Sequence, residues 1–379
     1  MTKLKEMFVM KKQTLKWFTL LLSVGILSSC GVLQDNEDTI DLGEPTEQVP
    51  VDTIEEPSEI NDSEINQDLT AWLPRLENVT YHYEGSGNEF AEYTKFPQFN
   101  QDAYYQTTSF NGGTALVEIY EYRDDEVVRV FEKGETYFRD NFTDIGTFKT
   151  DQEEEIVLKL PLEVGHSWES NDTTFEITSV DHEITVPAGT YKTIEVTATI
   201  EEDIVIKRYY ADGVGLVSDH YQDGDVVVES NLREIEEDTV ETINLQVYVA
   251  DDQAMGMDII DATLELETNA PARVALEELF TGQNENFPEI NILPEGTDIQ
   301  YLFLNDDRIV EVDVSEEFEQ MNAGSTGELF YIFNLVNTLS TYYGTTEVLL
   351  TVDGEPYTGG HMALSEGETL QFNQEMVNE

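Results

Sequence analysis

The feature that most limits the fold of this chain is a series of short segments rich in Val, Ile, Thr and Tyr, between about Leu69 and Glu234. In one segment Ile194, Val196, Ala198 and Ile200 alternate with Glu and Thr, the period of a β-strand with one solvated face. The candidate strands are Ala115–Tyr122, Val127–Glu132, Thr136–Asn141, Thr174–Val180, Thr193–Ile200, Ile204–Tyr210, Leu216–Tyr221 and Val226–Ser230. No segment here has the spacing of an amphipathic helix, so we predict an antiparallel all-β domain at residues 69–235.

Turn residues separate these segments. Asp223-Gly224 between two candidate strands is a typical hairpin turn, and Asp124-Asp125 and Lys133-Gly134 interrupt the pattern similarly. Because such turns join strands that are neighbours in the chain, the domain is expected to be mostly up-and-down.

Three longer motifs mark the same region: LPLEVGHSW at 160–168, VPAGTY at 186–191 and YYADGVGLV at 209–217. We interpret them as structural, with Pro-Ala-Gly forming a tight turn and Trp168 filling a core, rather than as a catalytic use of His166. The motifs resemble a β module of lipoproteins from Gram-positive bacteria, and this resemblance implies no particular activity.

A charged joint at Glu234–Thr242 precedes a region with a different pattern. The strands predicted there are Leu245–Ala250, Thr263–Thr268, Asp298–Asn305, Ile309–Val314 and Val348–Val352. Together with two segments of helical spacing, they are typical of a small α/β sandwich with two helices on one face of a sheet, which we assign to residues 243–357. The chain as a whole is then α+β.

The first helix is predicted around Ala272–Phe280, where apolar residues recur at helical spacing. Asn269 is placed to cap its start. Gly282 and Gly344 lie just beyond the ends of the two helices, where glycine often ends a helix.

The second helix runs from about Gly327 to Tyr343, with Ser325 and Glu328 as a capping box. Its expected apolar face consists of Leu329, Ile332, Phe333, Val336, Leu339 and Tyr343. Asn337 and Thr338 in its middle are poor helix formers. They are expected either to close the helix onto a neighbouring loop, around Leu293–Thr297, by a side-chain hydrogen bond, or to contact a ligand or partner.

Several motifs of this region occur together in a fixed order: LQVYV at 245–249, ALEELFTG at 275–282, LPEGT at 293–297, VDVS at 312–315 and VNTL at 336–339. They resemble the GerMN domain, named for a sporulation and spore-germination lipoprotein, over about residues 245–357. Where the family has the motif LL-x-GP, this chain has LFTGQ at 279–283. The resemblance implies an envelope protein that acts through protein–protein contact rather than catalysis, with sporulation as its setting.

The N-terminal 29 residues have the parts of a secretory leader. A basic head precedes the apolar run Phe18–Leu27, which is too short to span a bilayer as a helix. The run ends in Leu27, Ser28, Ser29 and Cys30, which resembles a bacterial lipobox. The resemblance implies cleavage before Cys30 and lipidation of that residue, which would anchor the chain at the outer face of the cytoplasmic membrane. An uncleaved anchor or an ordinary signal peptide is the alternative.

Residues 30–68 are expected to form a disordered acidic linker. The stretch from Asp35 to Asp68 has acidic residues throughout, three prolines, and no aromatic, Lys or Arg residue. Such a composition buries too little apolar surface to offset the entropy of the chain. At the other end, residues 358–379 form a tail, in which Ala363–Phe372 either adds an edge strand or stays loose.

The chain is strongly acidic, with 79 Asp and Glu against 19 Lys and Arg and a formal net charge of −60. This charge repels nucleic acid and anionic lipid, so neither is an expected partner. Because the acidic residues are spread over the whole chain, we interpret them as keeping an exported protein soluble, with cation binding as the alternative. A single cysteine excludes a disulfide within the chain.

Catalytic signatures are absent. The sequence has no Gly-x-Ser-x-Gly, HExxH, Walker A or dinucleotide motif, and no EF-hand loop. The histidines are scattered without metal-ligand spacing, so no metal, cofactor or catalytic residue is assigned. Paired carboxylates are so abundant that a glycosidase is not excluded by counting.

These observations favour a membrane-anchored lipoprotein that is not an enzyme and that contacts envelope proteins or peptidoglycan. One alternative is a cell-wall-modifying hydrolase in the β domain. Another is a solute-capturing lipoprotein, although neither domain is large enough for the usual two-lobed capture fold.

Overall fold

The computed structural model describes residues 65–145, 153–201 and 204–378. The predicted leader and most of the acidic linker lie outside these residues. Within them, the N-terminal part is mostly β, with two short helices, α2 (Leu69–Trp72) and α3 (Phe142–Ile145). Its strands are β1 (Val79–Ser86), β2 (Tyr93–Gln101), β3 (Tyr104–Asn111), β4 (Ala115–Tyr122), β5 (Glu126–Gly134), β6 (Glu155–Lys159), β7 (Ser167–Ser170), β8 (Thr173–Val186), β9 (Gly189–Glu201), β10 (Ile204–Ala211), β11 (Gly215–Asp223) and β12 (Val226–Glu237).

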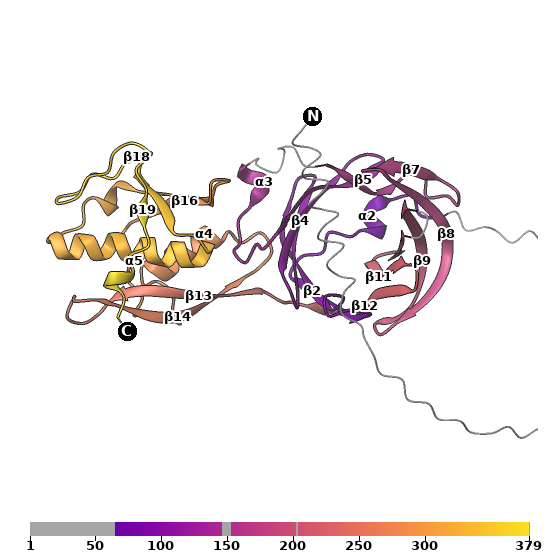
Figure 1. Cartoon of the computed structure of the whole chain (residues 1–379), viewed down its shortest axis with the longest axis horizontal. Coiled ribbons are helices and arrows are strands. Elements are labelled where there is room, and N and C mark those ends of the chain that lie inside the picture. The colour runs from indigo at the N-terminus through magenta and orange to yellow at the C-terminus, as the bar shows by residue number, and fades with distance from the viewer. Residues whose placement is uncertain (1–64, 146–152, 202–203, 379) are drawn as a thin grey trace, which may run out of the picture. The chain divides into compact units, whose positions relative to one another are not determined.

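These strands form one twelve-stranded antiparallel sheet that curls into a nearly closed, barrel-like form (Figure 1). Neighbours in the sheet are neighbours in the chain, except that β1 pairs with β12, from Val79 opposite Glu237 onward. Side chains close the remaining gap between β6 and β7: the amide of Ile156 donates to Ser170 Oγ at 3.0 Å, and Trp168 Nε1 donates to the Ile156 carbonyl at 2.9 Å. The up-and-down prediction is therefore confirmed.

Helix α2 lies inside the curled sheet and fills part of its interior (Figure 1). Leu69 and Trp72 are buried against Trp168 and Phe175, whose rings stack with centroids 5.7 Å apart. Trp168 is thus a core residue, as predicted. The tight turn of VPAGTY is also confirmed, because β8 ends at Val186 and β9 starts at Gly189.

Two predictions for this part are wrong. Thr136–Asn141 is not a strand: after β5 the chain leaves the sheet, and Phe138 and Arg139 are buried against the C-terminal part instead. The expected charged joint is largely strand, because β12 continues to Glu237, with Glu234, Glu236 and Glu237 exposed, and β13 begins at Glu241. Pairing with β1, which the sequence analysis missed, holds this end of β12 in the sheet.

The C-terminal part contains a two-stranded ribbon, a small sheet and two helices. Its elements are β13 (Glu241–Ala250), β14 (Met257–Leu266), α4 (Ala272–Phe280), β15 (Ile299–Leu304), β16 (Ile309–Val314), η3 (Glu316–Phe318), α5 (Ser325–Tyr343), β17 (Glu347–Val352), β18 (Glu355–Pro356), β19 (Leu370–Gln371) and η4 (Gln374–Met376). The sheet has the order β15-β16-β17-β18, with β16 and β17 parallel, and β19 also pairs with β17. The tail therefore adds a short strand.

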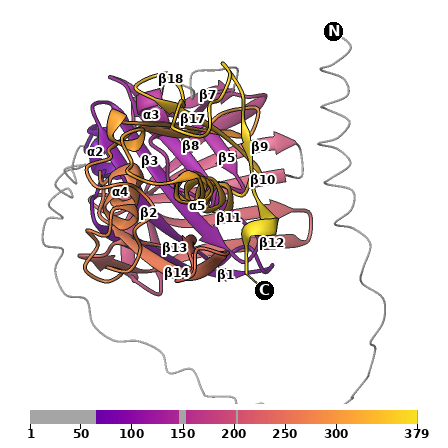
Figure 2. The ribbon, with the colours of Figure 1, turned by 90° about the vertical axis from the view of Figure 1, so that its left-hand side faces the viewer.

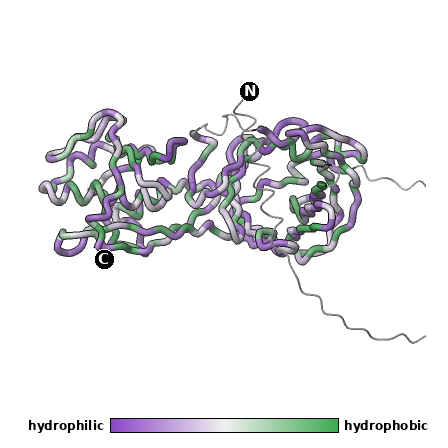
Figure 3. Tube along the Cα trace, viewed as in Figure 1, coloured by the Kyte–Doolittle hydropathy of each residue, from purple (hydrophilic) through white to green (hydrophobic). Residues whose placement is uncertain are grey.

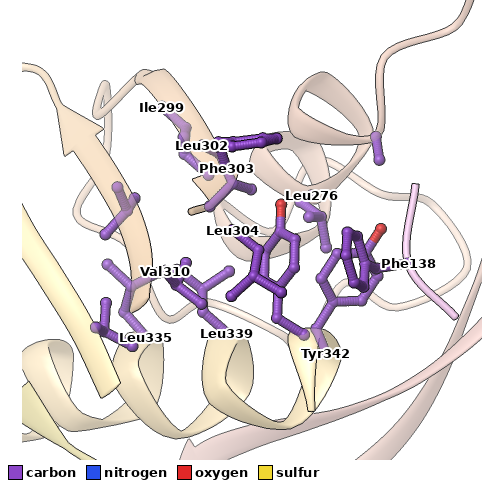
Figure 4. Packing of buried hydrophobic residues seen from close by; sticks show 14 of the residues in the cluster. Phe138, Leu276, Ile299, Leu302, Phe303, Leu304, Val310, Leu335, Leu339 and Tyr342 are labelled. Atoms are coloured by element: carbon purple, nitrogen blue, oxygen red, sulfur yellow. The ribbon is translucent and has the colours of Figure 1, made fainter. Parts of the chain in front are cut away.

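Helix α5 lies between the β13–β14 ribbon and the β16–β17 sheet, and Figure 2 shows it nearly end-on. Helix α4 is placed similarly, in contact with β14 and β15. The helices are thus covered on two sides, and a simple two-layer α/β sandwich is not confirmed. Their apolar residues form a core with the inner face of the sheet, shown in Figure 4 around Leu276, Phe303 and Leu339.

Both predicted helix starts were wrong in detail. Asn269 does not cap α4; its Oδ1 accepts the amide of Asn100 at 2.7 Å. Ser325 does not cap α5, and Glu328 is buried beneath the tail, where it accepts the hydroxyl of Tyr357 at 3.0 Å. The left-handed φ of 63° at Gly344 confirms the predicted end of α5.

Two residues that follow β5 join the N-terminal and C-terminal parts through buried polar contacts. Arg139 donates from Nη1 to Glu241 Oε2 at 2.8 Å and from Nη2 to the carbonyl of Gln98 at 2.9 Å. Next to it, Asp140 Oδ1 accepts the hydroxyl of Tyr343 at 2.8 Å. We call Arg139, Asp140 and Glu241 the joint.

Strands β2–β5 therefore have two buried faces, and we call them the shared wall. Val117 and Ile119 of β4 belong to the same core as the helices of the C-terminal part, whereas Glu118 and Tyr120 face the interior of the curled sheet. Figure 3 shows hydrophobic and hydrophilic residues mixed along the chain. Because successive side chains of a strand point to opposite faces, the two faces of the shared wall carry different kinds of side chain.

Candidate functional site

The interior of the curled sheet holds a cavity of about 330 Å³, lined by the shared wall, by residues of β10 and β11 and by Leu73 and Pro74, which follow α2. Alternate residues of each strand line it. In β3 the lining residues are Tyr105, Thr107, Ser109 and Asn111. Between them, Gln106 points to the other face and donates to the Asp140 carbonyl. The strand period thus decides which side chains reach the cavity.

Tyrosines make up much of the lining: Tyr81, Tyr83, Tyr93, Tyr105, Tyr120, Tyr122 and Tyr210. The rings of Tyr83 and Tyr93 stack with centroids 4.4 Å apart. Burial raises the pKa of Tyr83, so its hydroxyl remains protonated at neutral pH. These side chains present flat apolar rings together with polar hydroxyl groups.

Three of the tyrosines hold backbone segments in place. Each donates its hydroxyl to a carbonyl at 2.8 Å: Tyr83 to Leu216, Tyr105 to Leu76 and Tyr122 to Leu73. Two of these carbonyls belong to the chain just after α2. The tyrosines therefore fix one end of the cavity by binding the segment that closes it.

Six charged side chains cross the lining as a series of ion pairs in which positive and negative groups alternate. In order, they are Lys95, Glu118, Arg129, Glu155, Arg208 and Asp219. The distances between the paired nitrogen and oxygen atoms along this series are 2.9, 3.1, 2.8, 2.7 and 3.3 Å. Three positive and three negative charges cancel, so the lining is balanced in a strongly acidic chain. We call this series the charge ladder.

The two carboxylates near the ends of the charge ladder differ in acidity. Burial alone would raise the pKa of Glu118, but Lys95 and Arg129 outweigh burial and lower it to about 2. For Asp219, burial raises the pKa and Arg208 offsets only part of the effect. Glu118 is therefore fully ionised at neutral pH, while Asp219 accepts a proton more readily than an ordinary aspartate.

One lining residue has an unused hydrogen-bonding group. Within the described residues, Thr107 Oγ1 has no hydrogen-bond partner, although the residue is only 1% exposed. A buried hydroxyl without a partner is unfavourable by itself. Thr107 belongs to the cavity lining, and a small shift of the side chains that cover its hydroxyl would let a bound molecule supply the missing partner.

The residues singled out from the sequence are not part of this cavity. Leu27, Ser28, Ser29 and Cys30 lie outside the described residues. Asn337 is fully buried in α5, where it accepts the amide of Asn373 at 2.8 Å and donates to the carbonyl of the same residue at 3.1 Å.

Thr338 is also fully buried, and its hydroxyl accepts the amide of Tyr248 at 3.0 Å. The side chain of Asn337 thus closes the helix onto the tail rather than onto Leu293–Thr297, and Thr338 bonds to the ribbon. Asn337 thus fastens α5 to the tail, and Thr338 fastens it to the β13–β14 ribbon.

The sequence analysis missed the charge ladder. The feature of the sequence that could have indicated the ladder is the scarcity of positive residues. Lys95, Arg129 and Arg208 are three of only 19 Lys and Arg in the chain. Each lies within a segment of strand character, at a position that a one-faced strand would leave in solvent. Only the curling of the sheet turns this face into an interior.

Two further searches of the structure concern membranes and metals. No helix in the part of the chain that the structure describes is long and apolar enough to cross a membrane. Among the same described residues, no group of three or more His, Cys, Asp and Glu side chains is arranged to hold a metal ion.

Comparison with solved structures finds several similar folds. The first GerMN domain of the sporulation protein GerM from Bacillus subtilis is 20% identical, with a TM-score of 0.26, covering 35% of this chain and 98% of that one. A candidate lipoprotein from Clostridium perfringens is 17% identical, with a TM-score of 0.22, covering 35% and 88%. An exported protein with a YmcC-like fold from Bacteroides fragilis is 12% identical, with a TM-score of 0.28, covering 43% and 98%. At these values the likenesses do not bear on function.

Comparison by sequence gives a more specific result for one part of the chain. No curated protein matches the chain significantly. A family match, in contrast, covers nearly all of the ribbon, the small sheet and the two helices. Residues 246–358 match the Germane family, whose description is "Sporulation and spore germination".

Proposed function

We propose that this protein is a membrane-anchored lipoprotein on the outer face of the cytoplasmic membrane that acts by binding rather than by catalysis. Cys30 carries the lipid, residues 30–68 hold the folded part away from the membrane, and the curled sheet receives a ligand. The Germane-type α/β domain at residues 243–357 contacts envelope proteins or peptidoglycan. The lipobox resemblance and the family match support this assignment.

The observation that carries the proposal is the charge ladder. Every charged residue lining the cavity is in an ion pair within the ladder, including all three carboxylates, Glu118, Glu155 and Asp219. A carboxylate that acts as a general base or nucleophile must reach the reacting atom, whereas each of these three already accepts hydrogen bonds from lysine or arginine side chains. Paired charges instead form a preorganised lining, which is suited to holding a molecule in one orientation.

Anchoring is tested by metabolic labelling with an alkyne-tagged fatty acid in bacteria that make the full chain. We expect label on the wild type and none on Cys30→Ala, because only a thiol at this position accepts the lipid. Ser28→Ala is the matched control, since it keeps a small residue beside the cleavage point and should be labelled normally. Equal labelling of Cys30→Ala would refute the anchor.

Partner binding is tested by crosslinking in intact cells, followed by recovery of the anchored chain. We expect envelope proteins or peptidoglycan fragments to be recovered with the wild type and to be reduced with Cys30→Ala. Recovery of neither from wild-type cells would contradict the proposed contacts.

One observation favours a second candidate, a cell-wall-modifying hydrolase. The environments of Glu118 and Asp219 shift their pKa values in opposite directions, as is typical of an acid and a base that act together. This candidate predicts turnover of purified wall fragments that is lost in Asp219→Asn. Absence of turnover by the wild-type chain would leave the binding role as the better account.

A further inference from the structure

We propose that the cavity of the curled sheet is a binding site for an uncharged saccharide unit. This inference rests on the proposed binding role and adds the chemical class of the ligand. It depends on three properties of the lining: its balanced charge, its tyrosine rings and the unpartnered hydroxyl of Thr107.

The balanced charge argues for a ligand without net charge. A cation entering the cavity would compete with Lys95 or Arg129 for Glu118, and an anion would compete with Glu155 for Arg208. Either would leave one member of a largely buried pair without its partner, which is strongly unfavourable. A neutral molecule can accept and donate hydrogen bonds at the same groups while every pair remains intact.

The tyrosines argue for a ring-shaped ligand with polar edges. Tyr81, Tyr83, Tyr93 and Tyr120 provide aromatic surface beside Lys95, whose ammonium lies 4.8 Å from the centre of the Tyr120 ring. A sugar ring has an apolar face of C–H groups and a rim of hydroxyls. It can therefore cover aromatic rings while its rim meets the charged groups and hydroxyls around them.

Thr107 argues for a ligand that forms hydrogen bonds. Thr107 lies between Tyr105 and Ser109 on the cavity side of β3, and its hydroxyl has no partner among the described residues. A sugar hydroxyl can serve as donor or acceptor to it, which an acyl chain cannot. A purely apolar ligand would leave the Thr107 hydroxyl unpaired. It would also displace water from the charge ladder without offering hydrogen bonds in place of that water.

The volume sets the size of the ligand. About 330 Å³ is near the lower end of the range for small-molecule sites. At the β3–β4 turn the lining residues Asn111 and Thr114 border the exposed glycines 112 and 113. The lining thus reaches the surface there, and a terminal unit of a longer glycan could enter at this end.

The test is titration of the purified full chain with glucose, N-acetylglucosamine and N,N′-diacetylchitobiose, followed by calorimetry. Glucosamine serves as a cationic probe, glucuronate as an anionic one and palmitate as an apolar one. We expect at least one neutral sugar to bind, with both charged sugars at least tenfold weaker. Binding of none of the neutral sugars, or tighter binding of a charged sugar or of palmitate, would overturn the proposal.

Two valine substitutions in the same strand locate the site. Thr107→Val removes the hydroxyl in the cavity, and we expect about fivefold weaker sugar binding, corresponding to one lost hydrogen bond. Thr108→Val is the matched control: its Oγ1 is also buried without a partner, but the residue does not line the cavity, so affinity should not change.

Both variants remove an unpaired buried hydroxyl, so neither should lower the melting temperature. Equal effects of the two variants on affinity would place the ligand elsewhere. Failure of sugar binding leaves the anchor unaffected, because labelling at Cys30 is measured separately. Loss of the anchor would likewise leave the titration valid.

Discussion

The two faces of the shared wall carry charged clusters that differ in their access to water. In the charge ladder, the side chains retain between 11 and 29% of their exposure. In the joint, the ion pair of Arg139 and Glu241 retains 0 and 5%. Similar residue types are thus partly hydrated on one side of a single layer of strands and sealed from water on the other.

The difference appears in the protonation of the acidic groups. In the ladder, two cations keep Glu118 ionised despite burial. In the joint, burial raises the pKa of Glu241 more than Arg139 lowers it, and it raises the pKa of Asp140 to about 7. Charges that remain near water can be used by a ligand, whereas charges sealed from water mainly determine how the two parts of the chain fit together.

The largest effect is expected for Arg139→Met. The substitution leaves Glu241 buried without its cation, which costs about 3–5 kcal/mol of the free energy of unfolding. Urea unfolding followed by circular dichroism measures this loss. The double variant Arg139→Met, Glu241→Leu removes both charges and should recover most of the stability. A loss below about 1 kcal/mol in the single variant would mean that the Arg139–Glu241 pair is hydrated like an exposed surface ion pair.

The pH dependence of the joint should depend on Asp140. Its folded pKa of about 7 exceeds the ordinary value of 3.8, so folding favours its protonated form. Its contribution to stability is therefore present at acidic pH and is lost as the pH rises toward 7, by about 3 kcal/mol between pH 5 and pH 8.

Asp140→Asn removes this titration and keeps an acceptor for the Tyr343 hydroxyl. Thermal unfolding of wild type and variant should therefore converge below about pH 4 and separate progressively up to pH 8, where the variant is the more stable. Parallel curves would exclude Asp140 as the titrating group.

The ladder should show the opposite pH dependence. The pKa of Glu118 is lowered from 4.5 to about 2, so its contribution is present above pH 4.5 and is lost as the pH falls toward 2. Glu118→Gln should cost about 2 kcal/mol at pH 7 and much less at pH 2.5, because most of the stabilisation gained by ionising Glu118 is lost over this pH range. Equal destabilisation at both pH values would show that packing, and not charge, is lost.

The smallest effect is expected at the closed end of the cavity. Tyr122→Phe removes one hydrogen bond to the Leu73 carbonyl and should cost about 1 kcal/mol. Tyr137→Phe is the control, since its hydroxyl bonds to Glu135 on the exposed surface and its loss should be within error. A comparable loss in both variants would contradict the role of Tyr122 in holding this segment.

Most strands and both long helices could be predicted from composition and periodicity, although β1, β2 and β3 were not among the predicted strands. The predictions failed where a second layer intervenes. Leu329 was assigned to the apolar face of α5 and is 40% exposed, whereas Asn337, Thr338 and Ser340 are fully buried. A helix covered on two sides lacks the single stripe that sequence patterns detect.

The sequence by itself determined the strand period, the turns, the helix ends at glycine and the motifs of the Germane match, since all of these depend on residues close together in the chain. Only the tertiary structure decided which face of β2–β5 became a cavity lining and which became a core. Lys95, Glu118, Arg129, Glu155, Arg208 and Asp219 come from six different strands. Closing the sheet brings these charges together, and no local pattern records which strands will meet.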